Sequence, residues 1–202
     1  MRKVQTQKNL EKTLHRTKTS DEELIAKYLE TQESKYFDQL YLKYSNKVFS
    51  KCISLLKNEA LAQDATQDIF LKIFLNLAKF GGKSKFSTWI YSITYNYCID
   101  LIRKGKKEKN IFSEDIEKVA DIAEEIPDSA ILEIEVKKLK IILDKIPVGD
   151  KAVLLMKYQD DMSIKEISET LFKSESAIKM KIKRAKHKVQ KVYKEIFAAR
   201  EY

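Results

Sequence analysis

Basic side chains crowd one face of a helix predicted near the C-terminal end of this 202-residue sequence. Apolar residues spaced three or four apart form a single stripe there, which leaves the basic residues on the opposite side. Residues 163–194 contain ten lysines or arginines against three glutamates, a local net charge of +7. Such a helix can enter a DNA major groove and pair with the flanking phosphates, although a solvated amphipathic helix is the alternative. The basic residues expected on the exposed side are Lys179, Lys181, Lys183, Arg184, Lys186 and Lys188.

A short element before this helix would position it. Ser163 and Glu166 have the spacing of a capping box, which predicts a helix that begins here and ends near Leu171. A tight turn over 172–175 and a long helix over 176–197 then complete a helix-turn-helix. This arrangement favours DNA recognition over an isolated solvated helix.

The composition predicts an all-α protein that binds a polyanion. Only four glycines and two prolines are present, and no segment shows the period-2 alternation of a half-buried strand. The net charge of +9 and the pI near 9.3 favour a polyanionic partner. No apolar run approaches the roughly 18 residues that span a bilayer, so we expect a cytoplasmic protein without membrane insertion. Cys52 and Cys98 are expected to be reduced core residues.

The chain divides into an arm, two small helical domains and a linker. Residues 1–20 carry six basic residues against one glutamate and predict a mobile basic arm. Residues 21–104 predict a bundle of four helices, the first opened by a capping box at Ser20 and Glu23. Residues 105–130 have a net charge of −4 and predict a flexible acidic linker that could shield the basic module. Residues 131–202 form the second domain, which ends in the helix-turn-helix.

Two helices of the first domain carry more apolar side chains than one core face needs. The helix over 59–79 has a wide apolar band that could serve both a core and a partner, or be buried on two sides. The helix over 87–104 follows a loop in which aromatic residues and lysines alternate. That composition suits the capture of unstacked bases, although on composition alone core packing is favoured. The residues of this helix expected to face the core are Trp89, Ile93, Tyr97 and Leu101.

Three segments together resemble the sigma-70 family of RNA polymerase sigma factors, in its two-domain extracytoplasmic-function group. AQDATQDIFLKIFLNLAKF (62–80) looks like region 2.2, and FGGKSKFSTWIYSITYNYCIDLIRK (80–104) is similar to regions 2.3 and 2.4. MSIKEISETLFKSESAIKMKIKRAKHKV (162–189) is similar to region 4.2. The resemblance covers roughly 35–105 and 133–195. It implies a first domain that docks on the polymerase clamp helices and opens the −10 element, and a second that reads the −35 element.

The resemblance also implies roles for individual residues. The polymerase-binding positions are Asp64, Gln67 and Asp68. The −10 positions are Phe80, Lys83, Lys85, Phe86, Tyr95 and Asn96, of which Phe80 and Asn96 would line the pocket for a flipped base. The −35 positions are Ser176, Lys179, Met180, Lys181, Lys183 and Arg184, of which Arg184 is best suited to a bidentate contact. The implied partners are core RNA polymerase (clamp helices and flap), promoter DNA and a separate anti-sigma factor.

Three residues depart from the family pattern, one of them Lys173, which replaces the apolar residue usual in the turn. Phe172 occupies the turn position where glycine is usual, and a positive φ there would cost about 1 kcal/mol relative to glycine. Met180 stands where a small polar residue is common, so the −35 base preference does not carry over.

Two other functions compete with the sigma-factor interpretation. A free-standing helix-turn-helix regulator would bind duplex DNA unaided, but would have no reason to place aromatics beside lysines over 80–97. An enzyme is not expected, because His15 and His187 lie in solvated basic segments and no phosphate-cradling loop or paired nucleophile appears. No cofactor is expected, and no cluster of cysteine and histidine suggests a metal site.

Overall fold

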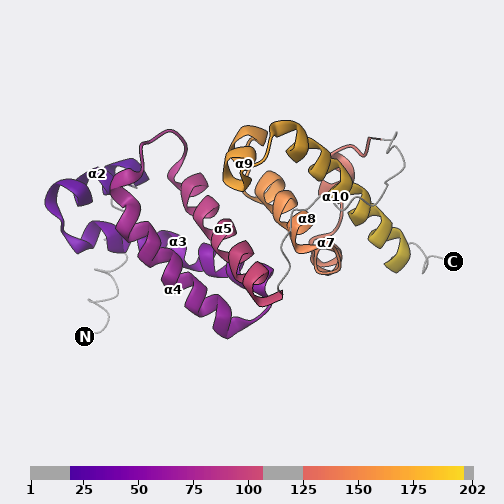
Figure 1. Ribbon diagram of the computed structural model, residues 1–202, viewed down its shortest axis with the longest axis horizontal. Helices are drawn as coiled ribbons and strands as arrows, with labels where there is room; N and C mark the ends of the chain where they lie inside the picture. The colour runs from indigo at the N-terminus through magenta and orange to yellow at the C-terminus, as the bar shows by residue number, and fades with distance from the viewer. Residues whose placement is uncertain (1–18, 107–124, 198–202) are drawn as a thin grey trace, which may run out of the picture.

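The computed structural model describes residues 19–106 and 125–197, which form two helical domains without a strand (Figure 1). The predicted all-α fold and its two-domain layout are confirmed. Most of the predicted basic arm and of the predicted acidic linker lie outside the described residues.

The N-terminal domain is a bundle in which α3 packs against the other three helices. Its helices are α2 (Asp21–Thr31), α3 (Ser34–Leu56), α4 (Glu59–Asn76) and α5 (Phe86–Lys106). The predicted capping box opens α2, since the Ser20 hydroxyl accepts from the Glu23 amide at 3.1 Å and the Glu23 carboxylate accepts from the Ser20 amide at 3.3 Å. On α4, Ala62 and Ala65 are fully buried, so α3 can approach closely. The short 3₁₀ turn Leu77–Lys79 ends this helix.

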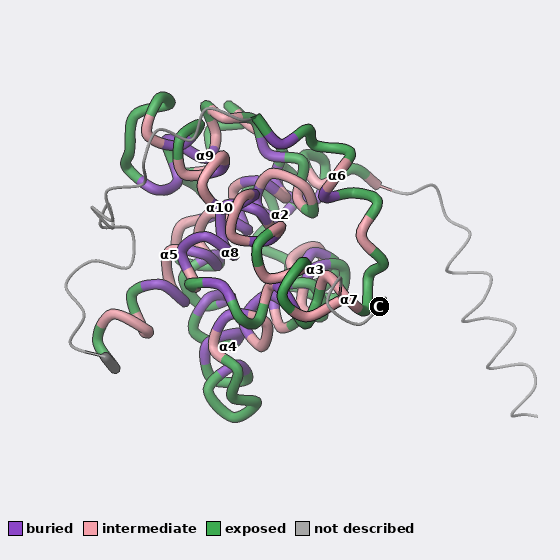
Figure 2. The backbone as a smooth tube through the Cα atoms, turned by 90° about the vertical axis from the view of Figure 1, so that its right-hand side faces the viewer, coloured by how far each residue is buried: buried purple, intermediate pink, exposed green. Residues whose placement is uncertain are grey.

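The C-terminal domain wraps short helices around one long helix. The elements are α6 (Ser129–Leu132), α7 (Val136–Leu143), α8 (Val148–Leu154), a π-helical turn (Leu155–Gln159), α9 (Ile164–Leu171) and α10 (Glu175–Ile196). The apolar stripe predicted for α10 is buried at Ile178, Ile182, Ala185 and Val189, and partly buried at Val192. Figure 2 shows buried and exposed segments along the helices of both domains. Burial of each large aliphatic side chain contributes about 1.5–3 kcal/mol, so this stripe fixes α10 against α8 and α9.

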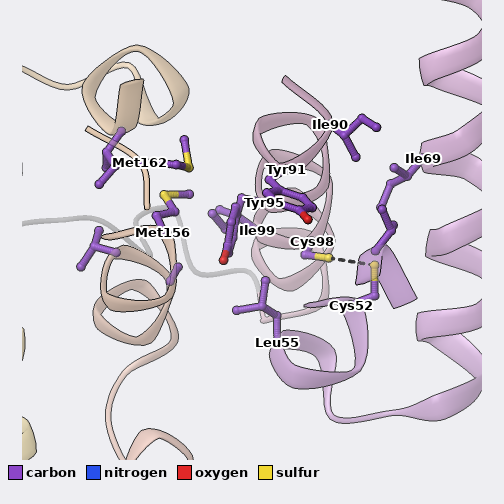
Figure 3. Packing of buried hydrophobic residues seen from close by; sticks show 14 of the residues in the cluster. Cys52, Leu55, Ile69, Ile90, Tyr91, Tyr95, Cys98, Ile99, Met156 and Met162 are labelled. Carbon is purple, nitrogen blue, oxygen red and sulfur yellow. Dashed lines mark hydrogen bonds between the residues drawn. The ribbon is translucent and has the colours of Figure 1, made fainter. Parts of the chain in front are cut away.

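The buried surface of α5 is wider than predicted. Trp89, Ile93, Tyr97 and Leu101 pack against the core as expected but are only partly buried. The buried residues of this helix are Ile90, Tyr91, Thr94, Tyr95, Cys98 and Ile99. The reason is that α5 is covered from two directions, by α3 and α4 of its own domain and by α9 of the other. Figure 3 shows Tyr95 and Ile99 directed toward the methionines of the C-terminal domain, while Cys98 points toward Cys52. The two thiols are free and buried as expected, with their sulfurs 3.6 Å apart.

Candidate nucleic-acid interface

Side-chain and backbone caps fix the geometry of the helix-turn-helix. The Ser163 hydroxyl accepts from the Glu166 amide at 3.2 Å, and the Ser163 amide donates to the Glu166 carboxylate at 2.8 Å. At the other end of α9, Phe172 adopts φ 53° and ψ 46°, the left-handed conformation that the missing glycine would favour. Ser174 then caps α10 by accepting from the Ala177 amide at 3.3 Å. The predicted turn is thus present, and α10 begins at Glu175, one residue before the predicted start.

All six predicted −35 residues lie on α10. Five of them form no ion pair with a carboxylate among the residues that the structure describes. Ser176, Lys179 and Met180 are exposed, while Lys183 and Arg184 are partly exposed. These residues occupy the first three turns of α10, where a recognition helix presents its base-reading side chains. The structure therefore brings a short basic surface together at the N-terminal half of α10.

Lys181, the sixth predicted residue, is held within the protein. Its ammonium lies 2.8 Å from one carboxylate oxygen of Asp150, and that of Lys188 lies 2.8 Å from the other oxygen. Asp150, on α8, has a side chain only 3% exposed, so a buried carboxylate draws both lysines toward the core. The helix face expected to carry free cations therefore contributes less charge to the surface than the sequence suggests.

The prediction that Lys186 faces solvent is wrong. The Lys186 side chain is buried, donates to the backbone carbonyl of Ile126, and lies 2.8 Å from a carboxylate oxygen of Asp128. The hydrogen bond from Lys186 holds the pKa of Asp128 below its ordinary value, and a second bond from Tyr158 acts in the same direction. Since Ile126 is also buried, residues 125–130 of the predicted linker pack on the C-terminal domain.

The loop before α5 carries the first part of the predicted −10 surface. Phe80 is partly exposed, and Lys83 and Lys85 are exposed around a left-handed Gly82 (φ 66°). Phe86 is only 1% exposed, so its assignment to the DNA surface is wrong. Its ring lies 5.2 Å from that of Phe80, and this contact anchors the loop to the core.

The two predicted −10 residues on α5 have different environments. Asn96 is partly exposed, as a base-contacting amide requires. Tyr95 is fully buried, and its hydroxyl donates to Asp160 of the C-terminal domain at 2.8 Å. Burial, reinforced by the negative charge of Asp160, raises the pKa of Tyr95 well above its usual value. Tyr95 therefore cannot contact DNA while the two domains are packed as they are here, which corrects its assignment for this arrangement.

The predicted polymerase-binding residues form one exposed face of α4. Asp64, Gln67 and Asp68 are all exposed, and Asp68 accepts a hydrogen bond from Tyr97 that raises the pKa of this tyrosine to about 12. The exposed apolar residues Leu71, Phe74 and Leu75 continue along the helix. Phe74 also lines an open groove of about 460 Å³ between α2, α3 and α4. The sequence signal for this second surface was the wide apolar band, which includes Phe74, whereas Leu71 and Leu75 were not predicted.

The domains meet at a polar cluster that the sequence did not reveal. Lys51 on α3 forms an ion pair with Asp160, and the two side chains are 5% and 3% exposed. At the edges of this contact, Ser92 and Thr170 share a hydrogen bond of 2.7 Å, and Lys151 donates to the Ser54 carbonyl at 2.8 Å. These contacts join residues that are 78 to 109 positions apart in the chain.

The described residues show neither a metal site nor a membrane span. None of their acidic, cysteine or histidine side chains forms a group of three that could hold a metal ion. No helix among them is both long enough and apolar enough to cross a bilayer.

Comparison with known proteins identifies both domains. Residues 40–108 match the family model for Sigma-70 region 2, and residues 138–189 match the one for Sigma-70, region 4. The chain belongs to the sigma-70 family. Its group is the extracytoplasmic-function (ECF) one: the ECF RNA polymerase sigma factor SigW of Bacillus subtilis is 29% identical over 163 residues, which cover 76% of this chain and 86% of the relative. SigM of the same species is 27% identical over 157 residues, covering 77% and 94%.

Two solved sigma-factor structures have the same fold. One is RpoE in complex with the anti-sigma factor NepR from Bartonella quintana, with a TM-score of 0.57, 19% identity and coverage of 78% of this sigma factor and 96% of that chain. The other is CnrH in complex with the cytosolic domain of CnrY, with a TM-score of 0.60, 22% identity and coverage of 87% and 98%. Both likenesses extend over the region 2 domain and the region 4 domain of this protein.

Proposed function

We propose that this sigma factor binds core RNA polymerase through α4 and directs promoter-specific initiation through two separate DNA surfaces. The observation that carries the proposal is the order of two sigma-70 regions in one chain, each on its own helical domain. The free-standing regulator is not favoured, because such a protein has no need of a region 2 domain. The protein acts by binding rather than by catalysis, and we place this activity in the cytoplasm.

The −35 element is assigned to the exposed half of α10. Arg184 supplies a planar guanidinium that can pair with two acceptors at once, whereas Lys179 and Lys183 supply point charges for phosphates. Lys181 is assigned a structural part, because Asp150 already holds its ammonium. Fewer residues of α10 are therefore assigned to contacts with the −35 element than the sequence implies.

The −10 element is assigned to Asn96 and the loop that carries Phe80. An extruded base needs an aromatic face to stack on and an amide that donates and accepts along its Watson–Crick edge. Phe80 and Asn96 supply those two groups, and the exposed Lys83 and Lys85 lie where they can follow the strand backbone. Stacking and hydrogen bonds to the captured base offset the few kcal/mol lost by unstacking it.

Polymerase is assigned to the face of α4 that combines carboxylates with apolar side chains. Asp64 and Asp68 suit basic groups on the clamp helices, and Leu71 and Phe74 supply the apolar area that such an interface needs at its centre. Of the two solved neighbours, RpoE is bound to the anti-sigma factor NepR, and CnrH is bound to the cytosolic domain of CnrY. By this likeness we also assign a separate anti-sigma partner to the present protein.

The test is run-off transcription with bacterial core RNA polymerase on a library of random upstream sequences, with the transcripts sequenced. Protein-dependent transcripts that share two spaced motifs are expected and would define both promoter elements. If no transcript depends on the protein, yet it binds duplex DNA alone, the regulator interpretation replaces this one.

The same assay tests the base pocket. Asn96→Ala should reduce promoter opening, measured by permanganate reactivity of unpaired thymines, without weakening co-elution with core polymerase. Asn46→Ala, on the exposed surface of α3, is the matched control. Equal opening by Asn96→Ala and the control would remove the pocket assignment.

A further inference from the structure

Lys51 is a buried cation of the region 2 domain whose charge partner comes from the region 4 domain. Its ammonium pairs with one carboxylate oxygen of Asp160, while the Tyr95 hydroxyl donates to the other oxygen. The same ammonium lies over the ring of Tyr91, 4.2 Å from its centroid. One anionic group is thus bound by an ammonium and a phenol, both from region 2, and the Tyr91 ring supports the ammonium from its other side.

These donors would suit a phosphate as well as a carboxylate. Both groups are acceptor-only anions, and both favour charge-assisted hydrogen bonds from lysine together with neutral ones from tyrosine. Among the ion pairs of the described residues, Lys51 has no carboxylate partner within region 2. A buried ammonium without a partner is costly, so region 2 alone must either hydrate this group or bind another anion there.

The site lies beside the surface assigned to the −10 element. Ser92 lies one turn before Asn96 on the same side of α5, and the hydrogen bond between Ser92 and Thr170 places α9 across this helix. The region 4 domain therefore covers part of the surface on which single-stranded DNA would run.

Reading both promoter elements requires the two domains to separate. Positions −10 and −35 are about 25 base pairs apart, which corresponds to about 85 Å of B-form DNA. A compact chain of about 200 residues has a radius of gyration of about 16 Å, so domains in contact cannot reach both elements. When the domains separate, Asp160 moves away from Lys51 and Tyr95. These two side chains then become accessible next to the DNA path.

We propose that Lys51, Tyr91 and Tyr95 form a phosphate-binding site for the promoter strand, which Asp160 occupies while the domains are closed. The carboxylate acts as an internal competitor of DNA. This inference rests on the proposed function, since it takes single-stranded DNA as the ligand. Asp160 then has two roles: it holds the two domains together, and it occupies the site that would bind a DNA phosphate. These two roles can be separated by experiment.

The experiment compares Asp160→Asn with the double variant Asp160→Asn/Lys51→Glu in the full chain. Small-angle X-ray scattering measures the radius of gyration, and anisotropy of a labelled single-stranded oligonucleotide measures affinity over a range of salt concentrations. Lys47→Glu and Asp161→Asn, both at exposed neighbouring positions, are the matched controls. Generic DNA without polymerase is used, so the result does not depend on run-off transcription.

Asp160→Asn should open the chain, because the closed state then buries an ammonium without a counter-charge. The ratio of open to closed molecules should rise by about a hundredfold or more. Its radius of gyration should rise, and its DNA affinity should rise by about tenfold or more. The double variant should be equally open, because its closed state buries the carboxylate introduced by Lys51→Glu without a counter-charge, but it should bind several-fold more weakly than Asp160→Asn. Its salt slope should be shallower by about 0.7, the value for one phosphate contact with a single strand. The two controls should match the wild type.

Two results would overturn the proposal. If the double variant binds DNA as tightly and with the same salt slope as Asp160→Asn, the phosphate site does not exist and Asp160 only closes the domains. If Asp160→Asn remains as compact as the wild type and binds DNA no better, Asp160 does not compete with DNA.

Discussion

Replacing Phe172 with glycine should stabilise this sigma factor. Phe172 ends α9 in the left-handed conformation (φ 53°, ψ 46°), which costs an L-residue about 1–2 kcal/mol because its Cβ approaches the following carbonyl. Glycine avoids that cost but loses about 0.4–1 kcal/mol of additional entropy when the chain folds. The Phe172 residue is 85% exposed, so the substitution removes little buried apolar area. The expected net gain is about 0.5–1 kcal/mol in the free energy of unfolding.

Urea unfolding followed by circular dichroism measures this gain, with Phe172→Ala as the control. Alanine removes the ring but keeps the Cβ, so it retains the conformational cost and should resemble the wild type or be less stable. Binding to −35 DNA should be unchanged, because glycine favours the turn geometry that is already present. An alanine variant at least as stable as the glycine variant would refute the reasoning, since the cost would then not arise at the backbone.

The remaining predictions concern charged residues. Arg184→Ala should weaken binding of −35 DNA by about 1–3 kcal/mol if the contact is bidentate to a base, whereas Lys181→Ala should change it by less than about 0.5 kcal/mol, both measured by titration of the selected promoter. Replacing Asp64 and Asp68 together with alanine should weaken affinity for core polymerase by roughly tenfold, as two exposed ion pairs allow; unchanged affinity would exclude that surface. The folded-state pKa of Asp128 is depressed, so its ion pair stabilises region 4 above about pH 4 and is lost as the pH falls through the folded pKa. Asp128→Asn should therefore show a smaller loss of stability on acidification than the wild type; an identical acid profile would contradict this.

Features set by neighbouring residues were predictable from the sequence. Ser163 and Glu166 form the expected capping box, since its partners are three positions apart and need no tertiary contact. The buried stripe of α10 follows from helical periodicity for the same reason. Phe172 has the positive φ that was considered for this turn position, because α9 ends in a left-handed C-cap there.

Features set by distant residues were not predictable. The burial of Tyr95 and its neighbours on α5 was missed because a second domain covers that side, and periodicity cannot report a partner that lies far along the chain. Asp150 and Asp160 carry no sequence signal that distinguishes them from solvated carboxylates, yet both are buried against lysines. Charge counting likewise treated Lys181 and Lys186 as available to DNA, although their partners withdraw them from the surface.

The spacing of the domain contacts along the chain has a consequence for biosynthesis. Within region 2, helices adjacent in sequence pack on one another, so this domain has few long loops to close and can fold once α5 has been made. Lys51 and Asp160 are 109 residues apart, and their contact must wait until most of the protein has left the ribosome. Each nascent chain therefore passes through a period in which region 2 is complete and still uncovered by region 4.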